Sequence, residues 1–422
     1  MAAGKGVRLE TFTLTRPKHL MPVAGSTLLE HTLRSIRSAG IGEVILVTHY
    51  MKDLIRSHIG DGSLLGLKVT YVEQQSLLGT GDALLACKSL IGAEPFLLVY
   101  GDLAFHPSIP KEVISFFEKG LNVILGVHAD NVKDFGLLEV ADSTLLGIRE
   151  KPKVGGPGIV NGGIYILNQD IFGYIEKTPR SERGELELTS AINMAIADGK
   201  KFAVYPTTSV RWVDVGRPWD VLDANRMLLD ALLRESRVEG SIEENVRIHG
   251  NVVIEPNTKI LSGTYIEGPV WISSGCKVGP NCYLRPYTYL CQGVRVGNAC
   301  EIKGSIIMNG THIGHLSYIG DSIIGADCNI GAGTITANLR FDDLPIKVTI
   351  KGERVSSGKR KLGAFLGDGV KTGINVSLYP GVKVGPGSWI APHIAVNRDV
   401  PPNALLTQKF ELQEKEIIDA DR

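Results

Sequence analysis

The sequence predicts two consecutive domains: an α/β domain built on a mostly parallel, Rossmann-like sheet, and a left-handed parallel β-helix after it. Up to Leu233, short β-rich runs alternate with helical stretches, which is the pattern of a sheet covered by helices on both faces. From Val246 an aliphatic residue returns at every sixth position, and a fixed short period of this kind is typical of a β-solenoid. The length of 422 residues also exceeds one ordinary core, which agrees with two domains.

The alternating pattern places the α/β domain at 1–233, with a linker over 234–245. The expected strands are 43–48, 68–72, 96–100, 122–127 and 159–167, and the expected helices are 27–39, 81–88 and 219–233. Ligands of such sheets bind at the carboxyl ends of the strands. Motifs in strand-to-helix turns are therefore the first candidates for function.

The sixth-residue period predicts the β-helix at 246–405. One aliphatic side chain per flat face would stack coil upon coil, with small residues such as Thr258 and Cys276 at the corners. The series consists of Ile248, Ile254, Ile260, Ile266, Ile272, Val278, Leu284, Leu290, Val296 and Ile302, and after a break of Leu366, Leu378, Val384, Ile390 and Val396. The break contains the basic stretch 340–361, which we expect to leave the solenoid as a solvated loop or as an arm toward a neighbouring subunit or coenzyme phosphates. Residues 406–422 are charged and are expected to form a helix or tail.

Composition excludes several classes of function. Hydrophobic residues make up 43% of the chain, and Lys+Arg and Asp+Glu both total 45, so we expect no nucleic-acid or membrane-surface footprint. No apolar stretch is long enough to span a membrane, and no secretion signal opens the chain. The 6 cysteines show no metal-ligand spacing, and four of them recur at one phase of the period, as buried fillers would. A cytoplasmic protein is expected.

Glycines and cations gather near the N-terminus. Gly4 and Gly6 would let backbone amides approach a triphosphate, while Arg8 and Lys18 supply positive charge. A pair of glycines alone is weak evidence for a phosphate-binding loop. It becomes specific evidence here because a second motif follows at this spacing, Pro17-Lys18-His19-Leu20-Met21-Pro22.

With these motifs the whole chain resembles bifunctional N-acetylglucosamine-1-phosphate uridylyltransferase / glucosamine-1-phosphate acetyltransferases, particularly the archaeal type. Its first half is also similar to the nucleotidyltransferase family that includes glucose-1-phosphate thymidylyltransferases. The resemblance implies that Arg8 and Lys18 are catalytic and contact the nucleotide phosphates. It also implies a nucleotide site, for UTP or dTTP, that consists of Ala3, Gly4, Gly6, Gln74, Gly79 and Thr80.

Carboxylates at two expected strand ends predict Mg²⁺ binding. Asp102 follows Val99-Tyr100-Gly101, and Asp214 lies in a W-x-D-x-G motif that matches the thymidylyltransferases; Mg²⁺ prefers such oxygen ligands. For the sugar phosphate of this half, the resemblance implies Gly136, Glu150, Lys151 and Asn161.

Residues that break the solenoid repeat resemble the acetyltransferase site of the same family. They imply that His315 is the general base, a role that imidazole side chains often take in catalysis. The implied sugar-phosphate ligands are Arg285, Lys303, Tyr318 and Asn329, and the implied acetyl-CoA contacts are Asn338 and Ala332. The family has an aromatic residue after this asparagine, whereas this chain has Leu339. The resemblance further implies a homotrimer through the β-helix, with active sites between subunits.

The leading interpretation is an enzyme that makes UDP-N-acetylglucosamine by acetylation of glucosamine-1-phosphate and uridylyl transfer from UTP. The sequence leaves open whether the acceptor of the acetyl group is glucosamine-1-phosphate or galactosamine-1-phosphate. The alternatives are a nucleotidyltransferase alone, such as a glucose-1-phosphate thymidylyltransferase or mannose-1-phosphate guanylyltransferase with a structural β-helix, and a non-catalytic regulatory subunit. Family members carry an apolar strand before the glycine-rich loop, and only Met1 precedes Ala2 here. We therefore expect the native start to lie upstream of Met1.

Overall fold

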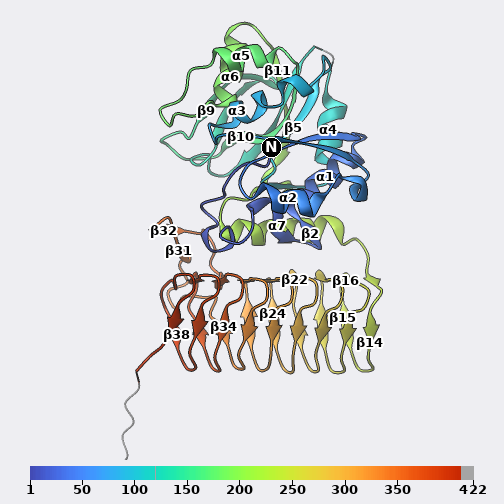
Figure 1. Cartoon of the computed structure of the whole chain (residues 1–422), viewed down its shortest axis with the longest axis vertical. Coiled ribbons are helices and arrows are strands. Elements are labelled where there is room, and N and C mark those ends of the chain that lie inside the picture. Colours follow the sequence, from blue (N-terminus) through green and yellow to red (C-terminus); the bar gives the residue numbers. More distant parts are fainter. Residues whose placement is uncertain (119, 410–422) are drawn as a thin grey trace, which may run out of the picture.

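The computed structural model describes residues 1–118 and 120–409. It contains an α/β domain that lies along one long side of a three-faced β-helix (Figure 1). The expected helix or tail over 406–422 lies mostly outside the described residues, although Leu406 closes the last strand of the β-helix. None of the described helices is long and apolar enough to cross a bilayer.

Among the described residues, seven α-helices lie around the sheets of the first domain. They are α1 (Leu28–Ser38), α2 (Lys52–Ile59), α3 (Thr80–Leu85), α4 (Ile109–Phe116), α5 (Ile171–Lys177), α6 (Leu188–Ala197) and α7 (Pro218–Leu232). Helix α1 begins with a capping box, in which the Thr27 hydroxyl accepts from the Glu30 amide and the Glu30 carboxylate accepts from the Thr27 amide.

The central sheet is mixed, and the expectation of a mostly parallel sheet is wrong. Its order is β5 (Phe96–Val99), β10 (Gly158–Leu167), β7 (Asn122–Ala129), β11 (Phe202–Thr208), β9 (Thr144–Glu150) and β8 (Gly136–Ala141). Strand β10 runs antiparallel to β5 and β7, and only β7 and β11 pair in parallel. The reason is that β7, β8, β9 and β10 follow one another without a helix, and parallel neighbours need a crossover connection.

Smaller sheets complete this domain. They are β1 (Pro22–Val23) with β2 (Ser26–Thr27), the parallel pair β3 (Glu43–Thr48) and β4 (Lys68–Glu73), and β6 (Leu103–Phe105) with β12 (Trp212–Asp214). Residues 1–3 lie between β3 and β5: the Ala2 amide donates to Val47 at 2.7 Å, and the Gly101 amide donates to Met1 at 2.7 Å. Beside Met1, where a preceding strand was expected, an apolar cavity of about 330 Å³ is lined by β3 and β5. The glycine-rich loop is nevertheless anchored by these hydrogen bonds.

Three parallel sheets form the faces of the β-helix. The first face holds β13 (Arg237–Val238), β16 (Val252–Ile254), β19 (Val270–Ile272), β22 (Thr288–Leu290), β25 (Ile306–Ile307), β28 (Ile323–Ile324), β33 (Phe365–Leu366) and β36 (Lys383–Val384). The second face holds β14 (Ser241–Ile242), β17 (Lys259–Ile260), β20 (Lys277–Val278), β23 (Arg295–Val296), β26 (His312–Ile313), β29 (Asn329–Ile330), β34 (Lys371–Thr372), β37 (Trp389–Ile390) and β39 (Leu405–Leu406). The third face holds β15 (Arg247–His249), β18 (Tyr265–Glu267), β21 (Tyr283–Leu284), β24 (Glu301–Lys303), β27 (Tyr318–Gly320), β30 (Ile335–Thr336), β35 (Ser377–Leu378) and β38 (Ala395–Val396).

The β-helix begins earlier than the sequence predicts. Strands β13 and β14 already pair with the next coil, so most of the expected linker 234–245 belongs to the solenoid. The first coil has no coil beneath it, and its Val238 and Ile242 are exposed. Without a buried aliphatic series, the pattern is weak there.

The apparent break in the period after Ile302 is a shortening of the coils. Val252 pairs with Val270, 18 residues on, whereas Tyr289 pairs with Ile306 and Ile306 with Ile323, 17 residues on. In these two shortened coils, one residue is missing at the turn from the third face to the first. The buried series therefore continues through Ile307, Ile313, Ile319, Ile324 and Ile330.

The stretch 340–361 leaves the solenoid as the hairpin β31 (Lys347–Ile350) and β32 (Glu353–Ser356). It is more than a solvated excursion, because Ile346 and Val348 are buried in the core between the domains. The same core joins outward side chains of the first face to the α/β domain. For example, the rings of Phe365 and Phe12 meet edge to face, with their centroids 6.5 Å apart. The two domains thus share a hydrophobic interface.

Candidate active sites

One cavity of about 520 Å³ in the α/β domain gathers nearly all the residues expected at the nucleotidyltransferase site. Its lining includes Ala3, Gly4, Arg8, Lys18, Gln74, Gly79, Thr80, Asp102, Gly136, Glu150, Lys151, Asn161 and Asp214. Gly6 lies behind this lining with φ +67°, and a Cβ there would lie 3.0 Å from the Lys18 Cβ. A side chain at Gly6 would therefore displace Lys18 from its path along the loop.

Lys18 and two carboxylates form the charged end of the cavity. Lys18 makes an ion pair with Asp102, and the Val215 amide next to Asp214 donates to the Asp102 carbonyl at 3.0 Å. Burial raises the pKa of Asp214, and the Asp102 charge raises it further. Burial also acts to raise the pKa of Asp102, but the Lys18 ammonium outweighs it and holds that pKa below its usual range. Asp102 and Asp214 both line the cavity and offer the oxygen ligands that a hard divalent cation prefers.

Arg8 packs against the backbone of the W-x-D-x-G motif. A Cβ on Gly216 would lie 2.5 Å from the Arg8 Nη2, so the glycine leaves the space that the guanidinium fills. His19 is a residue that the sequence did not single out. It lines the same cavity, and burial lowers its pKa to about 3, with the neighbouring Lys18 charge adding to the effect.

Hydrogen bonds within the chain fix the side-chain amides of Gln74 and Asn161. Gln74 is buried and its Nε2 donates to Asp82 at 2.8 Å and to the Gly79 carbonyl at 3.2 Å. Asn161 donates to the Tyr165 hydroxyl at 2.7 Å and accepts from the Gly163 amide at 3.0 Å. Both amides are held in one orientation at the cavity wall.

Gly136, Glu150 and Lys151, which were expected at the sugar phosphate, lie at paired ends of two strands. Gly136 pairs with Glu150 across β8 and β9, and Lys151 follows with φ +42° and donates its amide to the Phe135 carbonyl at 3.0 Å. Thr80 accepts from the Leu188 amide at 3.0 Å and so holds the start of α6. Arg183 and Glu187, which sequence reasoning missed, reach the cavity from the segment before α6.

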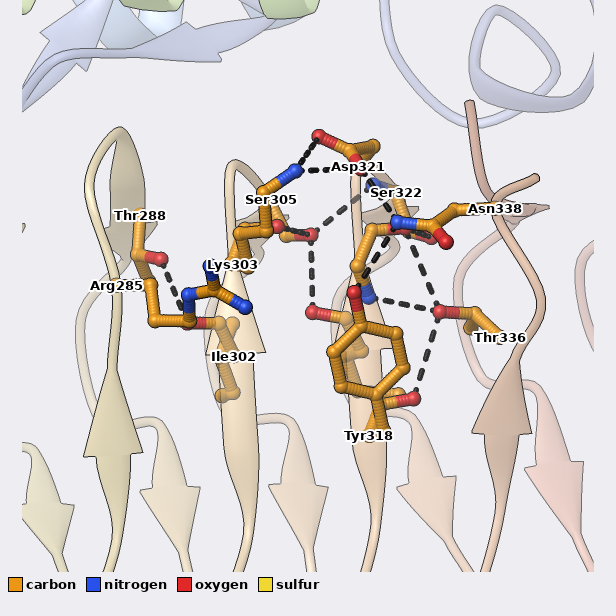
Figure 2. Close-up of polar contacts among 12 residues, drawn as sticks. Arg285, Thr288, Ile302, Lys303, Ser305, Tyr318, Asp321, Ser322, Thr336 and Asn338 are labelled. Atoms are coloured by element: carbon orange, nitrogen blue, oxygen red, sulfur yellow. Dashed lines mark hydrogen bonds and ion pairs between the residues drawn. The ribbon is translucent and has the colours of Figure 1, made fainter. Parts of the chain in front are cut away.

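In the β-helix, the expected acetyltransferase residues fall into two groups. The first group lies at the edge where the third face turns into the first (Figure 2). Lys303 Nζ contacts both Asp321 oxygens at 2.9 Å, and Asn338 Nδ2 donates to Asp321 at 2.6 Å and to the Tyr318 hydroxyl at 3.1 Å. Arg285 at the same edge pairs with Glu301 at 2.9 Å.

Asp321 is the centre of this edge cluster, and sequence reasoning missed it. It is 7% exposed and adopts φ +50°, at one of the turns that has lost a residue. Both its oxygens are used, so it fixes Lys303 and Asn338 relative to one another.

The second group lies at the edge between the second and third faces. His315 is exposed there between β26 and β27, and its carbonyl accepts from the Gly333 amide at 3.0 Å. Ala332 lies between β29 and β30, and Asn329 is exposed on β29. Within the described residues, no hydrogen bond joins the His315 side chain to Lys303, Tyr318 or Asn338. One chain therefore carries the two groups on different edges of the prism.

The fold and the first cavity define a nucleotidyltransferase. The nucleotidyl transferase family model matches residues 1–231, and a model of the GMPPB C-terminal domain matches 266–372. A solved glucose-1-phosphate thymidylyltransferase structure from Bacillus anthracis, in complex with a sucrose, aligns with a TM-score of 0.50 at 27% identity over 56% of this chain and 95% of that chain.

Relatives that match nearly the whole chain indicate acetyl transfer as the second activity. A "Bifunctional sugar-1-phosphate nucleotidylyltransferase/acetyltransferase" of Sulfurisphaera tokodaii is 44% identical over 95% of this chain and 97% of its own length. A "Bifunctional protein GlmU" of Methanococcus maripaludis is 44% identical over 98% of this chain and 97% of its own length. The chain belongs to this family of bifunctional sugar-1-phosphate nucleotidylyltransferase/acetyltransferases. It is an enzyme that uses a nucleoside triphosphate and an acyl donor, so the nucleotidyltransferase-only and regulatory-subunit interpretations are set aside.

Proposed function

We propose that this enzyme acetylates glucosamine-1-phosphate with acetyl-CoA and then transfers a uridylyl group from UTP to the N-acetylglucosamine-1-phosphate. The observation that carries the proposal is the edge cluster of Lys303, Asp321 and Asn338. It places an ammonium beside an amide on a surface edge, which suits a sugar phosphate. Galactosamine-1-phosphate, which differs at one hydroxyl, is a second acceptor to test, and dTTP is a second nucleotide.

In the nucleotidyltransferase cavity, a sugar-phosphate oxygen attacks the α-phosphorus, the bond to the β-phosphate oxygen breaks, and pyrophosphate leaves. Arg8 and Lys18 lie at the charged end of the cavity and stabilise the charge that develops on the phosphates. Asp102 and Asp214 would hold Mg²⁺, which would neutralise phosphate charge when bound. Gln74 would orient the base, with Ala3, Gly4, Gly79 and Thr80 around the nucleotide. Gly136, Glu150, Lys151 and Asn161 would hold the sugar phosphate.

In the acetyl transfer, the amine of the sugar attacks the thioester carbonyl. His315 takes the proton from the nitrogen as it attacks, and the coenzyme A thiolate leaves and is protonated. Arg285 and Lys303 would bind the phosphate, Tyr318 and Asn329 the sugar, and Asn338 and Ala332 the acetyl-CoA. Because His315 and Lys303 lie on different edges of one prism, we propose a homotrimer in which His315 of one protomer meets Lys303 of its neighbour.

A paired assay tests both halves. Coenzyme A release from acetyl-CoA and glucosamine-1-phosphate is expected to fall about 10²-fold or more in His315→Ala, with pyrophosphate release from UTP and N-acetylglucosamine-1-phosphate unchanged. Lys18→Ala is expected to give the reverse pattern. Release that survives His315→Ala would contradict the assignment of the base, and a monomer with full acetyltransferase activity would contradict the shared site.

A further inference from the structure

A cavity of about 580 Å³ lies between the two domains, at the edge where the first face of the β-helix turns into the second. One wall comes from residues 15–30 and helix α2, and the other from the coils that contain β16, β19 and β22 (Figure 1). Within the described chain it shares no lining residue with the nucleotidyltransferase cavity. We name it the interdomain cavity, and it lies at a different edge of the prism from Lys303 and from His315.

Polar side chains line this cavity at equivalent positions of three successive coils. The Gly293 amide, next to Gln292, donates to the Ser274 carbonyl, and the Gly310 amide, next to Asn309, donates to the Gln292 carbonyl, both at 3.0 Å. Coils of a parallel sheet are spaced by about 4.8 Å. In the part of the chain that the structure describes, the side chains of Ser274, Gln292 and Asn309 make no hydrogen bond of their own, so a row of hydroxyl and amide groups remains for a ligand.

Glu255 gives the same wall a negative charge. One carboxylate oxygen accepts from the Trp271 indole at 2.9 Å and the other from the Ser274 amide at 2.9 Å, and each oxygen keeps a second lone pair. Arg237 lies over the Trp271 ring but pairs with Glu239 at 3.5 Å. Among the described residues, no cation lies at ion-pair distance from Glu255, so a half-buried carboxylate faces the cavity without a counter-charge.

The other charged groups of the wall disfavour an anion. Arg16 pairs with Asp368 across the domain boundary at 2.5 Å, and the His58 Nε2 lies 3.4 Å from Glu30. A metal ion is also a poor match, because the described residues contain no group of three or more His, Cys, Asp or Glu that could hold one. The positive charge that complements Glu255 is therefore that of an organic ammonium.

We propose that the interdomain cavity binds a hexosamine, a sugar that carries a protonated amine and no phosphate. The ammonium contacts Glu255, and the ring hydroxyls contact the row of Ser274, Gln292 and Asn309. Leu20 on the opposite wall covers the apolar face of the ring, since binding sites combine apolar walls with a few placed polar groups.

The position of the cavity makes this ligand an effector of nucleotidyl transfer. Arg16 and Leu20 line the interdomain cavity, whereas Lys18 between them lines the nucleotide cavity. A ligand that fixes one side of this segment against the β-helix also fixes Lys18 on the other side. The two sites are therefore coupled.

Calorimetric titration of the full-length protein with glucosamine and with glucose tests the site, without acetyl-CoA or UTP and hence independently of the proposed acetyl transfer. The wild type is expected to bind glucosamine about tenfold more tightly than glucose, and Glu255→Gln to lose this preference, since a charge-assisted contact is removed. Gln292→Ala is expected to weaken both sugars severalfold.

Glu243→Gln is the matched control for Glu255→Gln. Glu243 accepts from the Ser262 amide at 2.9 Å, 19 residues further on, just as Glu255 accepts from Ser274, but Glu243 is exposed and lies outside the cavity lining. It is expected to bind both sugars like the wild type. Equal affinity of the wild type for glucosamine and glucose would overturn the role of Glu255.

Two further outcomes locate the site and test its effect. Glucosamine binding that is lost in Lys303→Ala but kept in Glu255→Gln would place the sugar at the edge cluster and overturn the inference. Glucosamine is expected to lower the KM for UTP about fivefold in the wild type, measured by pyrophosphate release, and to leave it unchanged in Glu255→Gln. A wild-type protein that binds glucosamine with no change in this KM would overturn the effector role.

Discussion

Gly216 illustrates how one residue without a side chain shapes the nucleotide site. A methyl group there would lie 2.5 Å from the Arg8 Nη2, and the guanidinium would have to leave its position at the cavity. We expect Gly216→Ala to lower kcat/KM for nucleotidyl transfer at least tenfold, a loss of about 1.4 kcal/mol or more in transition-state stabilisation. Pyrophosphate release measures this effect.

The matched control for Gly216→Ala is Gly173→Ala. Gly173 lies in α5, where an added Cβ has nothing within 4 Å, and alanine there favours the helix. Both variants should keep wild-type acetyltransferase activity. Equal nucleotidyl-transfer rates in the two variants would mean that Arg8 can act from a shifted position.

Asp321 gives a second prediction at the same scale. Its carboxylate holds Lys303 and Asn338 in place, and Asp321→Asn removes the charge that orients the ammonium. We expect the KM for the amino-sugar phosphate to rise about tenfold, as for the loss of a largely buried ion-pair partner, with nucleotidyl transfer unchanged. Asp327→Asn is the control, since Asp327 also occupies a left-handed turn (φ +54°) but is exposed. An unchanged or lower KM in Asp321→Asn would contradict a positioning role.

The same comparison shows why sequence reasoning found some site residues and missed others. Lys18, Asp102 and Asp214 lie in short motifs at strand ends, where the order of the chain itself points to a binding cavity. Asp321 contacts Lys303 and Asn338, which are 18 and 17 residues away in sequence, on neighbouring coils. In the sequence Asp321 cannot be distinguished from Asp327, because both are turn residues of the solenoid.

At the scale of elements, helix α1 makes stability depend on pH. His31 in α1 contacts the Val23 carbonyl through Nε2 at 2.9 Å, and burial lowers its pKa to about 4. The folded protein keeps this imidazole neutral while the unfolded chain protonates it below about pH 6.5. Its contribution to stability is therefore present above pH 6.5 and is lost as the pH falls toward 4, by up to about 3 kcal/mol.

Replacement of His31 by glutamine tests this dependence. His31→Gln removes the titrating group and keeps a donor for the Val23 carbonyl, so the fall in Tm between pH 7 and pH 4.5 should be smaller than in the wild type. His128→Gln, at an exposed position of β7, should leave the wild-type slope. Differential scanning calorimetry at both pH values measures it, and identical slopes in all three proteins would exclude His31 as a source of acid sensitivity.

The elements themselves were predictable to different degrees. The aliphatic period identifies the β-helix because each buried side chain, such as Ile260 or Ile272, repeats one environment. The mixed order of the central sheet was not predictable, because strand β10 inserts between β5 and β7 through contacts that leave no periodic signal. The shortened coils were missed for a related reason: loss of one residue between Ile302 and Ile307 shifts the phase without ending the solenoid.

At the scale of the whole molecule, the β-helix supports the nucleotide site of the other domain. Lys383 of β36 makes an ion pair with Glu10, and the Lys351 amide of the insertion hairpin donates to the same carboxylate. Glu10 follows Arg8 in the loop that begins with the glycines, and Phe12 behind it packs on Phe365 of β33. Residues of both domains therefore hold the glycine-rich loop in position.

Phe365→Ala tests this dependence. Removal of the fully buried ring is expected to cost about 3–5 kcal/mol of stability and to lower the Tm of the α/β domain as well as that of the β-helix. Because Phe12 loses its contact, the glycine-rich loop should become mobile and the KM for the nucleoside triphosphate should rise severalfold. Phe116→Ala in α4, where the ring is 38% exposed, should change neither quantity much. A Phe365→Ala protein of lowered Tm that keeps the wild-type KM would mean that the α/β domain positions the loop without the β-helix.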